Sequence, residues 1–123
     1  MTERTTESLA AWQWNLYPHN HTDRRNLVVH VLTTPLFWAG TLAVVTSFVT
    51  SFWSALAGVV LMVAVVAIQG RTHALETTPP VPFRGPLDVL GRIFIEQWFT
   101  FPRYVVTGGF SRAWRAARGV AGP

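Results

Sequence analysis

The feature that most constrains this chain is a long apolar stretch without formal charge. Residues 26–70 contain no Asp, Glu, Lys or Arg, and His30 is the only ionisable side chain among them. A helix rises about 1.5 Å per residue and a hydrocarbon core is about 30 Å thick, so one crossing takes about 20 residues. The stretch therefore predicts two crossings joined by a tight turn, which we place near Thr50–Ser54. The chain then returns to the membrane face that it left.

A soluble helical bundle is the alternative interpretation of the same stretch. Half of the 123 residues are apolar and only 13% are charged, against about 25% in ordinary soluble domains. A soluble bundle needs a polar face along both central helices, and Val59–Val66 offers none. We therefore predict an all-α fold: a membrane-embedded helical hairpin of two transmembrane helices, with flanking interfacial amphipathic helices. The length predicts one domain, residues 1–123, with the hairpin at about 23–70.

The arginines determine the predicted orientation of the hairpin. All ten basic residues are Arg, and none lies between Arg25 and Arg71. The positive-inside rule then predicts that both termini are cytoplasmic, in the cell membrane of a bacterium or the endoplasmic reticulum of a eukaryote. The net charge of +4 does not indicate nucleic-acid binding, because the arginines are dispersed among aromatic and apolar residues. Anionic lipid headgroups are the expected counter-charge.

Three segments outside the hairpin are predicted to lie in the membrane interface. The Trp-rich residues 9–17 indicate a short helix that ends before Pro18, since Trp and Tyr favour the headgroup level. Residues 86–99 follow a proline-rich connector and are too few to cross a bilayer, so they indicate a helix lying in the interface. The tail, residues 107–123, is a basic amphipathic segment expected to bind anionic lipid through regularly spaced arginines, Arg112, Arg115 and Arg118.

The helix predicted at 86–99 carries its charges on a single stripe. Asp88, Arg92 and Glu96 recur at a spacing of four, which places them on one helical face. We favour a solvated face held together by ion pairs. The alternative is that Glu96 or Arg92 turns inward, toward the site described next.

The histidines gather near the ends of the apolar stretch. A hairpin brings His73 and Glu76, which at a spacing of three would share a helical face, toward His21 and His30. An ionisable side chain within a membrane segment is a functional candidate. Imidazoles and a carboxylate, in a chain without Cys, suit Fe(II), Mn(II) or Zn(II). The spacing alone leaves open whether these histidines bind metal or are hydrogen-bonded packing residues.

Two motifs carry a resemblance to a known family. The first is His21-x4-Asn26-x3-His30-x4-Pro35, and the second comprises Gln69-Gly70, His73, Glu76 and Pro79–Pro80. In order and context they resemble the motifs of the Mpo1-like family, also described as the domain of unknown function DUF962. The resemblance extends over roughly residues 17–109.

The resemblance implies a function and a set of site residues. It implies a membrane-bound, non-haem Fe(II)-dependent dioxygenase, an oxidoreductase that shortens 2-hydroxy fatty acids by one carbon in α-oxidation. His21, His30 and His73 would be catalytic metal ligands. Glu76 and Asn26 would be ligands or partners of the ligands.

Several alternatives stay open beside that function. Arg24, Arg25 or Arg71 could pair with the substrate carboxylate, although we favour topology and lipid headgroups as their role. The metal could be Zn(II) or Mn(II), and the protein could be a membrane metalloprotein with hydrolytic chemistry. A non-catalytic membrane scaffold or lipid-binding protein is the third class. The sequence does not determine whether the chain forms a homo-oligomer.

Overall fold

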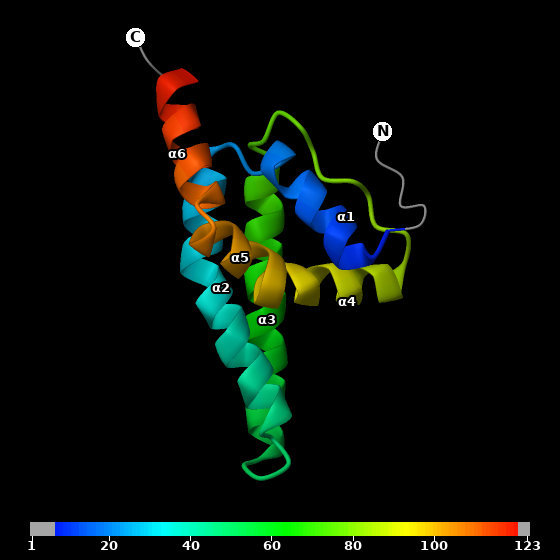
Figure 1. Ribbon diagram of the computed structural model, residues 1–123. Coiled ribbons are helices and arrows are strands. Elements are labelled where there is room, and N and C mark those ends of the chain that lie inside the picture. The colour runs from blue at the N-terminus through cyan, green and yellow to red at the C-terminus, as the bar shows by residue number, and fades with distance from the viewer. Residues whose placement is uncertain (1–6, 121–123) are drawn as a thin grey trace.

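The computed structural model describes residues 7–120, and its regular elements are all helical (Figure 1). In chain order they are α1 (Leu9–Leu16), the 3₁₀ turn η1 (Tyr17–His19), α2 (Arg24–Val45), α3 (Phe52–His73), α4 (Pro86–Ile95), the π-helical segment η2 (Glu96–Thr100), α5 (Phe101–Val106) and α6 (Gly109–Val120). Helices contain 77% of the described residues, and no strand occurs within residues 7–120. The predicted all-α class is confirmed.

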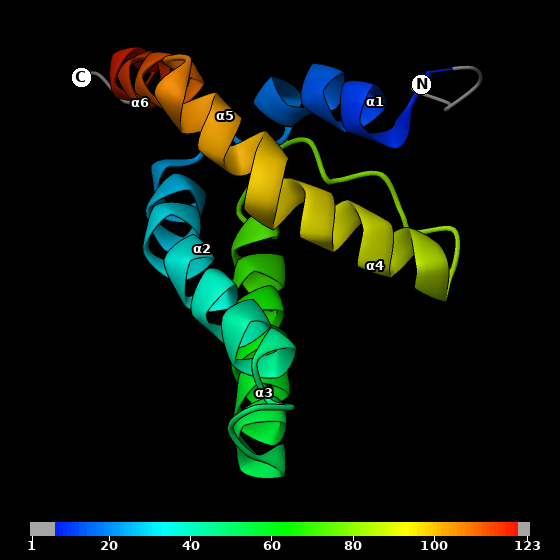
Figure 2. The ribbon, with the colours of Figure 1, turned by 60° about the horizontal axis from the view of Figure 1, so that its bottom comes forward.

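The two long helices, α2 and α3, run antiparallel and side by side (Figures 1 and 2). Their backbones touch where two glycines face each other. A Cβ atom on Gly40 would lie 2.8 Å from the carbonyl oxygen of Gly58, and one on Gly58 would lie 2.5 Å from that of Gly40. Small residues at such contacts are the usual means by which membrane helices pack closely.

Most of the apolar surface of this pair is exposed. Both helices are long and apolar enough to cross a membrane, yet only 22% of the apolar window of α2 and 17% of that of α3 is buried. The core helix of a soluble protein would bury most of such a surface. The exposure therefore favours a membrane environment over the soluble bundle.

The remaining helices gather around one end of the pair, where α2 begins and α3 ends (Figure 1). Here Tyr17, Leu27, Phe101 and Tyr104 form a buried cluster, against which α6 packs Trp114. The connector between α2 and α3 lies at the opposite end of the pair. The predicted convergence of the two ends of the apolar stretch is therefore present in the fold.

Several predicted boundaries are corrected. The turn between α2 and α3 spans residues 46–51, slightly earlier than predicted, because the Ser51 hydroxyl caps α3 by accepting from Ser54 N at 3.3 Å. Helix α3 ends at His73, so Glu76 lies beyond it and the two do not share a helical face. In the tail, α6 is helical to Val120, and the side chain of Arg118 and residues 121–123 lie outside the described part.

The segment predicted as a helix at 86–99 continues to Val106 as α4, η2 and α5 (Figure 2). Pro102 does not stop it. In the π register the N–H that proline lacks would pair with the carbonyl of Gln97, and the indole Nε1 of Trp38 donates to that carbonyl instead, at 2.7 Å. The wide turn and the Trp38 contact together keep the helix continuous.

Helix α4 turns its charged stripe inward. The side chains of Asp88 and Arg92 are each 9% exposed and lie 3.6 Å apart, whereas Leu87 is 84% exposed on the outer side. The favoured prediction of a solvated stripe is therefore wrong, and the alternative, that the stripe turns inward, is confirmed for Arg92. The contacts of Glu96, given in the next subsection, confirm it for that residue too. The prediction assumed that the face of α4 turned away from the protein meets water, but that face is apolar.

Candidate metal centre

Three histidines from different segments meet at the end of the α2–α3 pair. His21 precedes α2, His30 lies in the second turn of α2, and His73 is the last residue of α3. Their ring centroids lie 4.8–5.1 Å apart, at interplanar angles of 81–87°. The structure thus brings together the three histidines that the sequence predicts as ligands, while the fourth, His19, is exposed.

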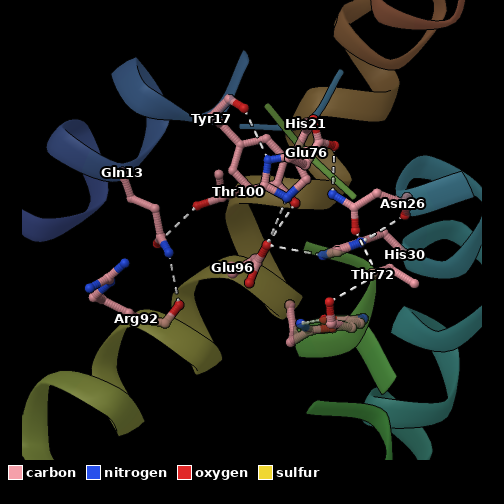
Figure 3. A network of polar contacts seen from close by, with 12 residues as sticks. Gln13, Tyr17, His21, Asn26, His30, Thr72, Glu76, Arg92, Glu96 and Thr100 are labelled. Atoms are coloured by element: carbon pink, nitrogen blue, oxygen red, sulfur yellow. Dashed lines mark hydrogen bonds and ion pairs between the residues drawn. The ribbon is translucent and has the colours of Figure 1, made fainter. Parts of the chain in front are cut away.

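Glu96, at the start of η2, completes the group. Its Oε2 atom lies 3.4 Å from His21 Nε2 and 3.5 Å from His30 Nε2 (Figure 3). One ligand atom from each of the three histidines and Glu96 lies within 4.8 Å of the others. That spread is close to what a shared ion requires, since imidazole and carboxylate ligands lie about 2.0–2.2 Å from zinc.

The tautomers of two rings are determined by backbone carbonyls. Nδ1 of His21 lies 3.0 Å from the carbonyl oxygen of Tyr17, and Nδ1 of His30 lies 2.9 Å from that of Asn26. A carbonyl oxygen only accepts, so each neutral ring carries its proton on Nδ1 and presents a lone pair at Nε2.

Those lone pairs find no hydrogen-bond partner among the described residues. The Nε2 atoms of His21 and His30, and Nδ1 of His73, are buried, and no donor or acceptor of that part of the chain lies in hydrogen-bonding geometry to them. Two nitrogen lone pairs that face the Glu96 carboxylate oxygen repel it, and a metal cation or a proton between them relieves this repulsion. The residues therefore fit a divalent metal ion.

The pKa shifts of His21 and Glu96, which lie outside the two long helices, favour the forms of these side chains that bind metal. Burial lowers the pKa of His21, and its contact with Glu96 only partly offsets this. Burial alone would raise the pKa of Glu96, but His21 and His30 outweigh burial and hold that pKa well below its ordinary range, because either ring stabilises the ionised carboxylate when it carries a proton on the facing nitrogen. Neutral imidazole and ionised carboxylate are the forms that bind metal.

Tyr17 and Gln97 were absent from the predicted site. The Tyr17 hydroxyl donates to Glu96 Oε2 at 2.8 Å, and its ring stacks on His21 with centroids 3.7 Å apart. Gln97 is buried and donates to the side chain of Gln69 at 2.6 Å. The only signal for Tyr17 was its position four residues before His21, and no sequence pattern marked the π turn, which is a feature often found at functional sites.

Glu76, predicted as a ligand or a partner, lies outside the group of four. Its carboxylate accepts hydrogen bonds from Thr22 N at 2.9 Å, Asp23 N at 3.0 Å and Asn26 Nδ2 at 2.8 Å. Burial alone would raise its pKa, but these bonds prevail and lower it. Glu76 therefore ties the end of α3 to the first turn of α2, where free N–H groups favour a negative charge.

Asn26 links the hydrogen-bonded group around Glu76 to the histidines. It is fully buried, its side chain accepts from Thr72 Oγ1 at 2.7 Å and its carbonyl oxygen orients His30. Asn26 and Glu76 hold the ligand-bearing helices together.

The arginines that the sequence left as possible partners of a substrate carboxylate lie outside the group of four. Arg24 donates to the carbonyl oxygen of Trp114 at 2.8 Å, Arg25 pairs with Asp23 at 2.8 Å, and Arg71 is exposed. Arg24 and Arg25 line a groove between α6 and the start of α2. A separate cavity of about 160 Å3 reaches His21, His73 and Glu96 and includes Arg92 in its wall.

Comparison with known proteins gives no match: no family model, no curated protein and no solved structure is similar to this chain. The resemblance to the Mpo1-like family stays a prediction from the sequence motifs. The structure itself gives an all-helical fold whose His and Glu cluster could hold a metal ion.

Proposed function

We propose that this chain is a membrane-bound, non-haem Fe(II)-dependent dioxygenase that shortens 2-hydroxy fatty acids by one carbon. One observation carries the metal-dependent part of the proposal: the Nε2 atoms of His21 and His30 face the Glu96 carboxylate at 3.4–3.5 Å, beside His73. Histidine and carboxylate ligands without thiolate suit Fe(II). The motif resemblance supports the choice of iron and of substrate.

The proposed reaction balances with O2 as the oxidant. A 2-hydroxy acid and O2 give the acid shortened by one carbon, carbon dioxide and water. Bound Fe(II) would supply the redox chemistry and a template for the hydroxyl and carboxylate groups. His21, His30, His73 and Glu96 would hold it.

The surrounding residues would keep this centre in its metal-binding form. The carbonyl oxygens of Tyr17 and Asn26 hold the protons of two imidazoles on Nδ1. The Tyr17 hydroxyl orients the Glu96 carboxylate. Such partners of metal ligands fix ring orientation and strengthen metal binding.

The proposed setting is a membrane hairpin with both chain termini on the cytoplasmic side. The exposed apolar surface of α2 and α3 and the outward apolar face of α4 support α2–α3 as the embedded part and α4 as an interfacial helix. A cysteine at Ser51 should react with a membrane-impermeant thiol reagent in intact cells, and one at Ser111 should not. The reverse labelling would overturn this orientation.

Product analysis tests the proposed reaction. Protein stripped of metal and reloaded anaerobically with Fe(II) should convert 2-hydroxypalmitic acid and O2 to pentadecanoic acid, measured by mass spectrometry. Palmitic acid, which lacks the hydroxyl, and Zn(II)-loaded protein serve as controls and should give no product.

Other outcomes separate the alternatives. Fe(II)-loaded protein that consumes no O2 with any 2-hydroxy acid would overturn the reaction and leave the metal centre. Hydrolysis by the Zn(II) form alone would favour a hydrolytic metalloprotein. Absence of metal after anaerobic, chelator-free purification would favour a non-catalytic scaffold.

A further inference from the structure

The groove between α6 and the start of α2 is separate from the candidate metal centre and has a volume of about 790 Å3. Helix α6 lies against α2 there (Figure 1). Three arginines line the groove, Arg24 and Arg25 from α2 and Arg112 from α6, and its other walls include Leu75 and Ala116. Positive charge and apolar surface thus meet in a space of the size that encloses small ligands, about 300–1,000 Å3.

The structure separates two arginines of α6 that the sequence treats as equivalent. Arg112 lines this groove together with arginines of α2. Arg115 lines a smaller groove of about 290 Å3, beside Val28 and Phe110. A diffuse attraction of the helix to an anionic surface would use both arginines alike. The different surroundings of Arg112 therefore indicate a more specific role.

The protein neutralises part of the positive charge in the groove. Within residues 7–120, one carboxylate lines it, that of Asp23, and this carboxylate pairs with Arg25 at 2.8 Å. The nearby carboxylate of Glu76 is turned to backbone N–H groups at the start of α2. Arg24 and Arg112 pair with no carboxylate of the described residues. An anion in the groove would supply the missing negative charge.

Backbone carbonyl oxygens orient the two guanidinium groups. Arg24 donates from Nε and Nη2 to the carbonyl oxygen of Trp114, at 3.1 and 2.8 Å, and lies over the Trp114 ring at 4.4 Å from its centroid. Arg112 donates from Nη1 to the carbonyl oxygen of Thr107 at 3.3 Å. Each guanidinium has five N–H donors, so both keep donors for a further acceptor.

The surface of α2 continues the apolar part of the groove toward the bilayer. Leu32 and Leu36 follow Arg25 at spacings of seven and eleven, which places them on the same side of the helix. They are 66% and 46% exposed. In the proposed membrane setting, a ligand with an anionic head and apolar chains would contact the groove and this side of α2 at once.

We propose that the groove binds the headgroup of one anionic phospholipid, with its phosphate between Arg24 and Arg112 and its acyl chains along α2. Guanidinium groups match the oxygens of a phosphate in geometry and charge. A zwitterionic headgroup would bring a further positive charge beside these two arginines, so the lipid has to be anionic. The inference goes beyond the proposed function and depends on neither the metal nor the reaction.

The first test varies the lipid. Native mass spectrometry of the full chain in a neutral detergent counts bound lipids during a titration. One phosphatidylglycerol should bind per chain, at least about tenfold more tightly than phosphatidylcholine with the same acyl chains. Metal-free and metal-loaded protein should bind it alike. Equal affinities for the two lipids would overturn the assignment.

The second test compares two exposed arginines of the same helix. Arg112→Gln should weaken phosphatidylglycerol binding at least about tenfold, because charge-assisted hydrogen bonds to the phosphate are lost. Arg115→Gln removes the same charge outside the groove and should bind as wild type does. Equal weakening in both variants would show a diffuse attraction and overturn the groove as a site.

The third test adds a charge and leaves every arginine in place. Ala116→Glu introduces a carboxylate into the groove, one turn from Arg112 at an exposed position, and should weaken phosphatidylglycerol binding at least about tenfold. Ser111→Glu, also exposed but on the side of the smaller groove, is the matched control and should bind as wild type does. Wild-type affinity in Ala116→Glu would contradict the proposal.

Two competitors distinguish the other possible occupants. Neither glycerol 3-phosphate nor 2-hydroxypalmitic acid should displace phosphatidylglycerol at a concentration equal to that of the lipid. Displacement by the first would show a site for soluble phosphate compounds, and displacement by the second would show a site for the proposed substrate. Either result would overturn the lipid assignment. Failure of this inference would leave the proposed function untouched, because metal content and product formation are measured separately.

Discussion

The carboxylates of Glu76 and Glu96 lie in similar positions, but the groups that surround them differ. Each carboxylate is largely shielded from water and close to a ligand histidine. Glu76 is surrounded by hydrogen-bond donors from Thr22, Asp23 and Asn26. Among residues 7–120, Glu96 has one hydrogen-bond donor, the Tyr17 hydroxyl, and otherwise faces ring nitrogens of His21 and His30 that have no hydrogen-bond partner.

This difference shows that shielding from water does not distinguish a structural carboxylate from a metal ligand. The number of hydrogen-bond donors around the carboxylate does distinguish them. A carboxylate that accepts several N–H bonds is already neutralised and joins two parts of the fold. One that faces lone pairs lacks a positive partner, and leaving such groups unsatisfied costs about 1–3 kcal/mol each. The region around Glu96 could therefore hold a cation, whereas the carboxylate of Glu76 is already satisfied by its donors.

The largest expected effect follows from removing a ligand of the Glu96 region. His30→Ala should lower metal affinity by more than about tenfold, which exceeds the usual effect of losing an outer partner. His19→Ala, at an exposed histidine outside the group, is the control and should retain its metal. Metal content is measured by mass spectrometry of the purified proteins. Retention of metal by His30→Ala would contradict the centre as described.

A smaller effect is expected when the one donor to Glu96 is removed. Tyr17→Phe keeps the ring that stacks on His21 but loses the hydrogen bond to Glu96. Metal affinity should fall by about tenfold, the lower end of the range for partners of metal ligands. Tyr104→Phe alters the neighbouring ring of the same buried cluster and should leave the affinity unchanged. Competition with a chelator measures both, and equal affinities for the two variants would remove the role given to Tyr17.

The region around Glu76 should respond in stability rather than in metal binding. Glu76→Gln should lower the unfolding free energy of the metal-free protein by about 1–3 kcal/mol, because hydrogen bonds to a charged group are lost. The lowered pKa of Glu76 means that its contribution is present above its ordinary pKa of 4.5 and is lost as pH falls below it. Glu7→Gln, at an exposed position, is the control.

Thermal unfolding in detergent at a series of pH values measures this effect. The difference between wild type and Glu76→Gln should be constant at neutral pH and shrink in acid. A difference that grows in acid would contradict the sign derived from the lowered pKa.

Much of the fold follows from the sequence because one physical constraint dominates it. A stretch without charge from Asn26 to Gly70 has to form two helices, and a return of the chain brings His73 back to His21. The exact ends were less predictable. Local caps such as the Ser51 hydroxyl decide them, and a cap differs little in sequence from any other serine near a turn.

Glu96 shows where sequence reasoning reached its limit. The spacing of Asp88, Arg92 and Glu96 predicts that they share one face of a helix, but it does not predict whether that face meets the solvent or the protein interior. In a soluble protein a charged face would meet the solvent. Here the outer side of α4 carries exposed apolar residues such as Leu87, so the charged face turns inward. Tyr17 could not be assigned, because its contact with Glu96 spans 79 positions in the chain.

The most direct test of the central claim compares metal stoichiometry in Glu96→Gln and Glu76→Gln, purified side by side without chelators. Each change removes one charge and keeps the shape of the side chain. If His21, His30, His73 and Glu96 hold one divalent ion, Glu96→Gln should retain less than about a tenth of the wild-type metal, and Glu76→Gln should match wild type. Full occupancy in Glu96→Gln, or an empty site in folded Glu76→Gln, would contradict the account.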